Sequence, residues 1–449
     1  MAAVGLAAVL FALSSGCSGS GQAETGAPPT TPPTATDDAA ATVLVVPDGP
    51  RLSERLSPRL GGQTTAFEQG EQAFNIPARN LGLPDDHRFV EANVVFERNF
   101  RESEGLGPRF SASSCTGCHV NNGRSPTAVE GEALGEGFVI LSVDERTRTL
   151  FGERLETQAI EGETAEGPAT VYWQQSIGTY DDGTVYELRS PEVVAAGGWL
   201  VPRIAPHVAG TGLLEAIPED DVRAQADPDD LDGDGISGRT REVVDVTTGA
   251  PALGRFGWRA VTPTVEAQTA TAFAKDMGLL TGLDPNIADP EVTAERADLA
   301  AFYAEALAVP AQRSGDDPDV RAGADLFEQT GCVSCHTPSF TTGRVETRAL
   351  SDQLIWPFTD LLLHDMGAGL NEPSSAPDVG DTEWRTPPLW GLGLHQVVNG
   401  NAALLHDGRA RSIEEAILWH AGEAEPSAAA FRGLPARRRA QLLAFLGSL

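Results

Sequence analysis

The sequence predicts a mainly α-helical protein with two domains and a β-containing insertion in the first of them. Two Cys-x-x-Cys-His motifs stand far apart, at residues 115–119 and 332–336, and helical spacing of apolar residues leads into each. Residues 135–215 differ, because the runs Phe138–Leu141 and Thr170–Trp173 are rich in β-formers and are separated by glycine and aspartate. These three observations set the expected architecture.

The N-terminal residues predict an export signal and a tether. Residues 1–17 contain an apolar run too short to span a bilayer, and small residues precede Cys17. Ser15-Gly16-Cys17 resembles a lipoprotein cleavage site, although no basic residue precedes the apolar run, so an ordinary signal is the alternative. Residues 18–48 are rich in Gly, Ser, Thr, Pro and Ala, which predicts a disordered tether. We expect a periplasmic or cell-envelope location, with a lipid anchor on Cys17.

The first domain is expected over residues 49–312. Phe89 to Phe100 has the apolar spacing of a helix and leads into the first motif through a Gly/Pro-containing loop. Helical spacing returns after the insertion, at residues 264–278 and 292–308.

The second domain is expected over residues 313–449. Gly323 and Phe327 lie four residues apart just before Cys332, and apolar residues of a terminal helix close the chain. A helix that leads into Cys-x-x-Cys-His, with another helix closing the domain, is the cytochrome c arrangement. The two halves also repeat a pattern, because Trp258-Arg259-Ala260 before a helix parallels Gly408-Arg409-Ala410 before another. A duplicated cytochrome c-like domain explains both observations.

Each motif supplies two thiols and an adjacent imidazole, which is what covalent haem attachment needs. The thiols form thioethers with the haem vinyl groups, and the histidine becomes the proximal iron ligand. A fifth cysteine, Cys17, is the candidate lipid site, so none is left for a structural disulfide. The sequence therefore predicts two covalent c-type haems, held by Cys115, Cys118 and His119 and by Cys332, Cys335 and His336.

Two other uses of these motifs are less consistent with the sequence. A zinc site is disfavoured because each cysteine pair has its own histidine and the pairs lie far apart. A thioredoxin-like dithiol needs a βαβ context, which is absent around either motif.

The formal net charge of −32 argues against nucleic acid or an anionic membrane surface as a partner. A small basic cytochrome, or another redox protein, would be steered towards such a surface as electron donor. Simple solubility is the alternative explanation of the charge.

Beyond the two motifs, several long segments of the chain form a recognisable pattern. They are Glu104–His119, Gly210–Glu219, Asp232–Arg239, Gly254–Ala260, Asp360–Gly367, Glu383–Gly393 and Leu404–Ala424. These segments resemble the di-haem oxidoreductase family, which is named for a peroxidase activity and is also labelled thiol oxidoreductase. The resemblance runs from about residue 60 to the C-terminus, and more distantly includes bacterial di-haem cytochrome c peroxidases. It implies a di-haem fold more strongly than it implies a substrate.

The resemblance implies a second axial ligand for the second haem. In bacterial di-haem peroxidases, a His-Asp-Gly turn precedes a helix that carries the distal methionine. Here His406-Asp407-Gly408 is that turn, and His420 stands where the ligand is expected. We therefore expect His336 and His420 to ligate one iron, with Met366 or His364 as the alternative to His420.

For the first haem, the resemblance points to Trp258, Gln268 and Asp276 as catalytic residues. Trp258 matches an inter-haem tryptophan, Gln268 a glutamine, and Asp276 a glutamate shortened by one methylene. A carboxylate over an open haem can move a proton between the two oxygens of peroxide. The alternative is that Asp276 is a solvated helix carboxylate and Trp258 a core aromatic.

One departure from the peroxidases bears on that haem. They commonly carry a histidine soon after the first motif, whereas this chain has none between His119 and His207. Either the first haem is open, or Met277 closes it.

The segment from Asp230 to Gly235 has oxygen ligands at the alternate positions of a calcium loop, in Asp230, Asp232 and Asp234. The glutamate expected at loop position twelve is missing, because Arg241 stands there and Glu242 follows. The segment is consistent either with a calcium site or with an Asp/Gly turn that binds no metal.

The leading functional hypothesis is a periplasmic di-haem enzyme that reduces hydrogen peroxide at the His119 haem, with electrons relayed by the His336 haem. A non-enzymatic di-haem electron carrier is the first alternative. Oxidation of a protein or small-molecule substrate through a high-valent haem is the second.

Overall fold

The computed structural model describes residues 49–449, except residues 196 and 375. The predictions for the export signal, for Cys17 and for the tether lie outside the described residues.

The α-helices are α1 (Leu52–Arg55), α2 (Leu83–Phe96), α3 (Cys115–Cys118), α4 (Glu145–Phe151), α5 (Thr211–Glu215), α6 (Glu219–Arg223), α7 (Val265–Asp276), α8 (Ala294–Ala306), α9 (Pro318–Gln329), α10 (His395–Asn399), α11 (Ile413–Leu418), α12 (Glu425–Gly433) and α13 (Ala436–Ser448). The strands are β1 (Arg109–Phe110), β2 (Phe138–Ser142), β3 (Gln158–Ala159), β4 (Ala169–Thr179), β5 (Val185–Ala195), β6 (Leu200–Ile204), β7 (Glu242–Val244), β8 (Pro251–Leu253), β9 (Phe340–Thr341), β10 (Leu354–Ile355), β11 (Leu363–Asp365) and β12 (Glu383–Arg385).

The fold class is mixed rather than mainly α, with 33% helix and 16% strand. The strands pair two by two into small antiparallel sheets, and most of those outside the predicted insertion are only two or three residues long. The expectation of a mainly α protein is therefore only partly right. Such short strands carry no alternation of apolar and polar residues that the sequence could reveal.

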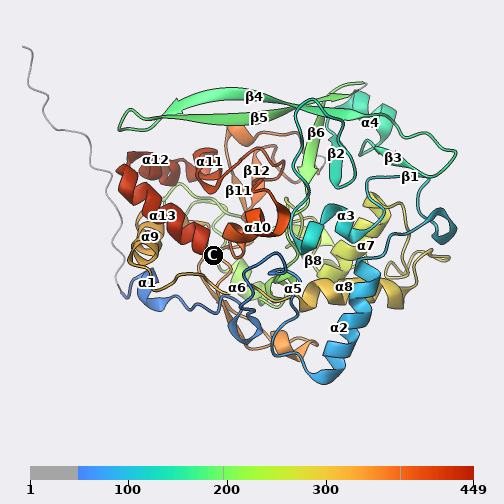
Figure 1. Cartoon of the computed structure of the whole chain (residues 1–449), viewed down its shortest axis with the longest axis horizontal. Helices are drawn as coiled ribbons and strands as arrows, with labels where there is room; N and C mark the ends of the chain where they lie inside the picture. Colours follow the sequence, from blue (N-terminus) through green and yellow to red (C-terminus); the bar gives the residue numbers. More distant parts are fainter. Residues whose placement is uncertain (1–48, 196, 375) are drawn as a thin grey trace, which may run out of the picture. The chain divides into compact units, whose positions relative to one another are not determined.

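The predicted β runs in residues 135–215 form strands. β2 pairs with β6, and β4 pairs with β5 in a long hairpin whose register runs from Ala169 opposite Ala195 to Thr179 opposite Val185. Figure 1 shows this hairpin along one edge of the molecule, above α11 and α12. The Tyr180 hydroxyl at its tip donates to Glu414 on α11 at 2.7 Å. The hairpin from the first half thus anchors a helix of the second.

Helices lead into both Cys-x-x-Cys-His motifs, as expected. α2 precedes the first motif and packs on α8, while α9 precedes the second and packs on α13. Gly323 lies where α9 and α13 cross, since a Cβ there would come within 1.9 Å of the Gln441 carbonyl oxygen. The main apolar core takes residues from both predicted domains, among them Phe96 and Phe327. The boundary at residues 312/313 stays a prediction.

An internal repeat relates α7 to α11. In each half an isolated antiparallel bridge is followed by a Thr or Ser N-cap, whose side chain accepts from the third helical residue, and then by the helix. The first bridge residue, Phe256, is separated from its counterpart Leu404 by the same number of residues as the members of three further pairs. The further pairs are Thr262 with Ala410, Thr264 with Ser412, and Val265 with Ile413. Equivalent helices therefore stand beside the two motifs.

No helix in residues 49–449 is both long and apolar enough to cross a membrane.

Candidate functional site

The first motif opens into a cavity with about 720 Å³ of empty space, counting its mouth. Both predicted distal residues, Gln268 and Asp276, line this cavity together with His119. Cys115, Cys118, Ala272 and Met277 also line it. The structure thus brings the predicted first-haem residues together, except for Trp258.

His119 is oriented by the backbone. The Ser114 side chain caps the short helix α3, and His119 follows its last residue. The Nδ1–H of His119 donates to the Pro206 carbonyl at 2.8 Å, which leaves Nε2 as the lone-pair nitrogen. Burial lowers the pKa of His119, so the imidazole stays neutral. A neutral imidazole with a fixed tautomer is the form that binds a metal.

Helix α7 carries Gln268 and Asp276, two turns apart, on the cavity side. The Oε1 of Gln268 accepts a hydrogen bond from the Thr262 hydroxyl at 2.8 Å. The amide NH₂ of Gln268 is therefore left to donate into the cavity.

Asp276 has a partner that the sequence did not suggest. Its carboxylate forms an ion pair with Arg154, which follows α4 in the predicted insertion, and both side chains are mostly buried. Arg154 is remote from Asp276 in sequence and belongs to no motif, so only the tertiary fold reveals it. The pair makes Asp276 a compensated buried charge rather than a solvated helix carboxylate.

Met277 lines the same cavity but is held in an apolar cluster with Phe100, Phe110 and Phe273. Its side chain is 3% exposed, and its backbone carbonyl accepts from Gly107. Met277 is thus close enough to remain a candidate ligand and is also a packed core residue.

The second motif lines a larger cavity, with about 1390 Å³ of empty space counting its mouth. The predicted residues His336, His420, Met366 and His364 all line it, as do Cys332 and Cys335. The rings of His336 and His420 have centroids 6.5 Å apart, with an interplanar angle of 42°.

Both imidazoles of this pair are fixed as His119 is. His336 Nδ1–H donates to Phe358 O and His420 Nδ1–H donates to Ala416 O, each at 2.8 Å. Burial lowers the pKa of both residues, to about 4 for His336. Each is therefore a neutral imidazole with Nε2 free to ligate.

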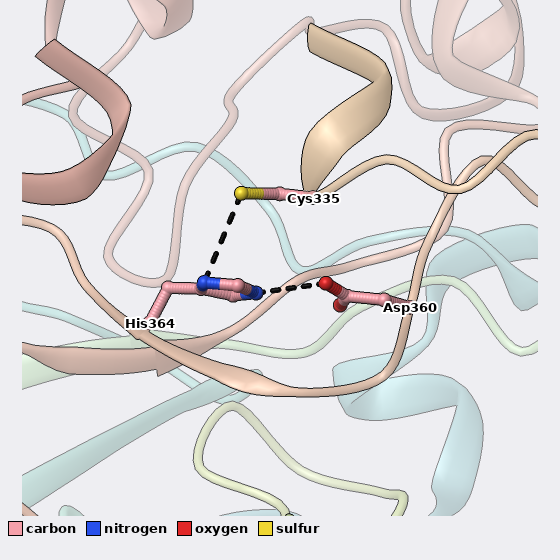
Figure 2. Close-up of side chains that lie close together, drawn as sticks. All are labelled: Cys335, Asp360 and His364. Atoms are coloured by element: carbon pink, nitrogen blue, oxygen red, sulfur yellow. Dashed lines mark hydrogen bonds and ion pairs between the residues drawn. The ribbon is translucent and has the colours of Figure 1, made fainter. Parts of the chain in front are cut away.

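His364 is held differently, between the carboxylates of Asp360 and Glu423. Figure 2 shows its contacts with Asp360 and with the Cys335 sulfur. Its Nε2 bonds Asp360 and its Nδ1 bonds Glu423, both at 2.8 Å, while the Cys335 sulfur lies 3.8 Å from Nδ1. Burial alone would lower the pKa of His364, but its bonds to Asp360, Cys335 and Glu423 outweigh burial and raise that pKa to about 12. An imidazolium with both nitrogens engaged is a poor iron ligand.

Cys335, Asp360 and His364 have ligand atoms within 4.8 Å of one another, close enough for a metal ion. A thioether at Cys335 would remove its thiolate from such a site. Metal binding at this cluster and haem attachment at Cys335 are therefore mutually exclusive.

The four cysteines that the structure describes are free thiols. Burial raises the pKa of Cys115 and Cys118 to about 12, and that of Cys332 to about 11. Thiols held un-ionised are poor redox nucleophiles and poor metal ligands. Paired thiols beside a neutral, oriented histidine at a large cavity fit haem attachment better than a zinc or dithiol site.

Trp258 lines the second cavity, not the first. Its Nε1–H donates to Ile204 O at 2.8 Å, and the Arg124 guanidinium lies 5.8 Å from its ring centroid. Sequence reasoning singled out neither Arg124 nor Arg385, which also line this cavity, although Arg385 lies in the segment Glu383–Gly393 that carries part of the resemblance. Both are buried without an ion-pair partner in the described residues.

The predicted calcium loop is arranged around Asp227 rather than around Asp234. The carboxylate oxygens of Asp227, Asp230 and Asp232 lie within 4.8 Å of one another. Asp234 accepts instead from the Ile236 backbone N–H. Near the missing twelfth position, Arg241 pairs with Asp378 and Glu242 pairs with Arg223.

Comparison with known proteins gives one family. The family model described as "Di-haem oxidoreductase, putative peroxidase" matches residues 57–167, 193–288 and 279–449. Among solved structures, a hydrazine synthase from Kuenenia stuttgartiensis pressurised with 20 bar xenon shares 13% identity. Its TM-score is 0.38, over 94% of this chain and 100% of that chain, which is too low to establish a shared fold. No curated protein matches significantly. Because the family model covers most of the sequence, the chain belongs to the di-haem oxidoreductase family.

Proposed function

We propose that this protein is a peroxidase that reduces hydrogen peroxide at a haem held by His119, using electrons that enter through a haem held by His336. The observation that carries the proposal is the asymmetry of the cavities. The second has a facing pair of neutral histidines, whereas the first has one histidine with an acid and an amide.

The geometry of the second cavity supports His336 and His420 as ligands of one iron. The two rings face each other with centroids 6.5 Å apart, and both Nε2 atoms are free, so this pair would hold a haem iron between them. A six-coordinate haem transfers electrons but leaves no site for peroxide.

The internal repeat supports an open first haem. The interval that relates Val265 to Ile413 also pairs Ala272 with His420 along the sequence, although His420 lies two residues beyond the end of α11 and Ala272 lies within α7. Ala272 lines the first cavity, so alanine stands at the sequence position that the second half gives to His420, the proposed ligand. The carboxylate and amide of α7 then face the space that a sixth ligand would fill.

Covalent attachment is part of the proposal. In each motif the two Cys S–H groups would add across the two haem vinyl groups, which forms a thioether at each sulfur. The paired thiols of each motif and the oriented histidines support this assignment.

A haem bound in the first cavity would supply the electrons that reduce peroxide. Reduction of hydrogen peroxide breaks its O–O bond, consumes two electrons and two protons, and gives two waters. The Asp276 carboxylate would take the proton from one peroxide oxygen and deliver it to the other, which leaves as the first water; the remaining oxygen leaves as the second water after taking up the two electrons and two protons. Gln268 donates its amide N–H into the same space, and Arg154 holds Asp276 in place.

The electron-carrier alternative depends on Met277, which lines the first cavity and would close the haem if it ligated the iron. Its packing among phenylalanines favours a structural role. Replacing Met277 by leucine distinguishes the ligand role from the packing role. The spin state of the first haem would change only if Met277 is a ligand of its iron.

The donor, the location and the calcium site remain proposals. The net charge of −32 favours a basic redox protein as donor. Export with lipidation at Cys17 is consistent with c-type haem attachment, and the carboxylates of Asp230 and Asp232 beside Asp227 offer oxygen ligands for calcium.

Substitution of Asp276 by asparagine tests the catalytic assignment. We expect peroxide turnover to fall by about 10²- to 10⁴-fold, because the proton shuttle is lost, while both haems remain bound. Steady-state turnover with a reduced cytochrome donor measures the effect. The matched control is Glu153→Gln, which removes a neighbouring carboxylate paired with Lys275 outside the cavity lining. Unchanged turnover in Asp276→Asn would remove Asp276 from the mechanism.

A further inference from the structure

Two buried arginines line the second cavity without a carboxylate to balance them. Arg124 is 5% exposed and Arg385 is 6% exposed. Neither forms an ion pair with any residue in the described part of the chain. This contrasts with the net charge of −32, which makes carboxylates abundant elsewhere.

Arg124 reaches the cavity from the first motif. Both backbone groups of Arg124 are held by the Asn399 side chain, which accepts from its N–H at 3.1 Å and donates to its carbonyl at 3.2 Å. Its Nε donates to His395 Nε2 at 3.2 Å, and its Nη1 is buried with no hydrogen-bond partner. Burial lowers the pKa of Arg124 to about 10, which leaves it charged at neutral pH.

Arg385, on β12, approaches Trp258. Its Nε donates to Gly257 O at 2.9 Å, and its backbone N–H donates to Trp258 O at 3.0 Å. Nη1 donates to Thr386 O, whereas no acceptor for Nη2 occurs in residues 49–449 outside the two gaps. Burial lowers the pKa of Arg385 to about 10 as well, opposed by Asp360.

The two guanidinium groups therefore converge on the Gly257–Trp258 segment. Arg124 stands over the Trp258 ring at 5.8 Å, and Arg385 is bonded to the backbone of that residue and of the one before. Both also act on His207, whose pKa falls to about 3 through burial and then through the charges of Arg124, His119 and Arg385. Neither cation has an ion-pair partner in the described residues, and Arg385 has only the more distant charge of Asp360, so an anion at this end of the cavity would be stabilised.

We propose that Arg124 and Arg385 bind a carboxylate at the Trp258 end of this cavity, and that this carboxylate is a propionate of the haem held by His336. The inference rests on the proposed haem assignment. Guanidinium groups bind carboxylates through paired, charge-assisted hydrogen bonds, and the free Nη atoms of both arginines offer the donors.

This assignment couples the two haem sites through the covalent chain. Arg124 follows His119 by five residues, so the segment that holds the first haem also contacts the second. Asn399 fixes that segment against α10.

The test compares holo-protein variants by resonance Raman spectroscopy of the propionate bending mode and by the reduction potential of the low-spin haem. In Arg124→Gln and Arg385→Gln we expect the mode to move to lower frequency and the potential to fall, because a hydrogen-bonded cation is lost. Arg124→Lys should recover part of both shifts. Arg255→Gln is the matched control, since Arg255 is equally buried at 5%, donates to Leu214 O, and lines neither cavity.

The outcomes separate the possible failures. Unchanged propionate modes in both glutamine variants would overturn this inference while leaving the haem assignment intact. A shift of mode and potential in the wild type on addition of formate would show that the arginines take a free carboxylate, and would equally overturn it. Wild-type protein without a Soret band would instead overturn the proposed function. If Arg124→Gln does not mature, Arg385→Gln, which lies in the other half, decides the question.

Discussion

The orientation of single side chains determines what each cavity can bind. His119, His336 and His420 each donate Nδ1–H to a backbone carbonyl, which fixes the ring and leaves Nε2 free. His364 has both nitrogens engaged by carboxylates and stays an imidazolium. This difference explains why His420 is a better candidate ligand than His364.

Some of these residues could be predicted from the sequence and others could not. Gln268 and Asp276 stand two turns apart on one helix, so local spacing was enough to predict that they share a cavity. Arg154 and Arg124 meet their partners across long sequence separations, where no periodicity links them. Trp258 was expected between the two haems on the strength of the resemblance, and it lines the second cavity but not the first.

Glu305 on α8 gives a pH-dependent prediction at the scale of one side chain. Burial raises its pKa from 4.5 to about 8, assisted by the charge of Glu215 and opposed by Arg88. Between those pH values the folded protein keeps a proton that the unfolded chain releases, so the free energy of unfolding falls as pH rises from 4.5 through 8.

We therefore expect Glu305→Gln to raise the free energy of unfolding at pH 8 by on the order of 2 kcal/mol, with little effect near pH 4.5. Urea unfolding of the holo protein at both pH values measures this. Glu295→Gln, at the exposed start of the same helix, should have no such pH-dependent effect. An equal gain at both pH values would contradict the explanation.

At the scale of elements, the molecule places one capped helix against each motif. α7 and α11 begin at equivalent positions after equivalent bridges. The sequence parallel predicted a repeat, but with Ala410 opposite Ala260, whereas the structure pairs Ala410 with Thr262. The small sheets made of β7 to β12 were not predictable, because pairs of two or three residues depend on tertiary contacts rather than on a local pattern.

The crossing of α9 and α13 yields a second prediction. Gly323→Ala should lower the free energy of unfolding by ~3 kcal/mol, because the new Cβ would lie 1.9 Å from the Gln441 carbonyl oxygen. Gly447→Ala on α13 is the control, since a Cβ there meets nothing within 4 Å, and helix propensity predicts a change within about 1 kcal/mol of the wild type. Thermal unfolding of both variants measures the difference, and comparable stabilities would show that the helices can separate at this point.

The equivalence of Ala272 and His420 yields a third. Ala272→His should place an imidazole at the position equivalent in sequence to His420, the proposed ligand, convert the proposed first haem to low spin, and abolish peroxide turnover. Ala272→Leu fills the same space without a ligand atom, so its spin state should resemble that of the wild type. A high-spin signal that persists in Ala272→His would mean that the repeat does not align the two cavities.

At the scale of the whole molecule, one apolar core is shared by both halves, and the two cavities beside it are lined by different side chains. The β4–β5 hairpin of the first half bonds α11 of the second, and Arg124 reaches from the first motif into the second cavity. The chain carries a net charge of −32, while the buried charge at Trp258 is positive. In the proposed function, one half receives electrons from a basic donor and the other half uses them.

The most direct measurement is electron paramagnetic resonance of the oxidised holo protein, matured in a host that assembles c-type cytochromes. The account predicts one low-spin haem with two histidine ligands and one high-spin haem that becomes low-spin when cyanide is added. Two low-spin haems that both ignore cyanide would contradict it, since neither iron would then have a place for peroxide.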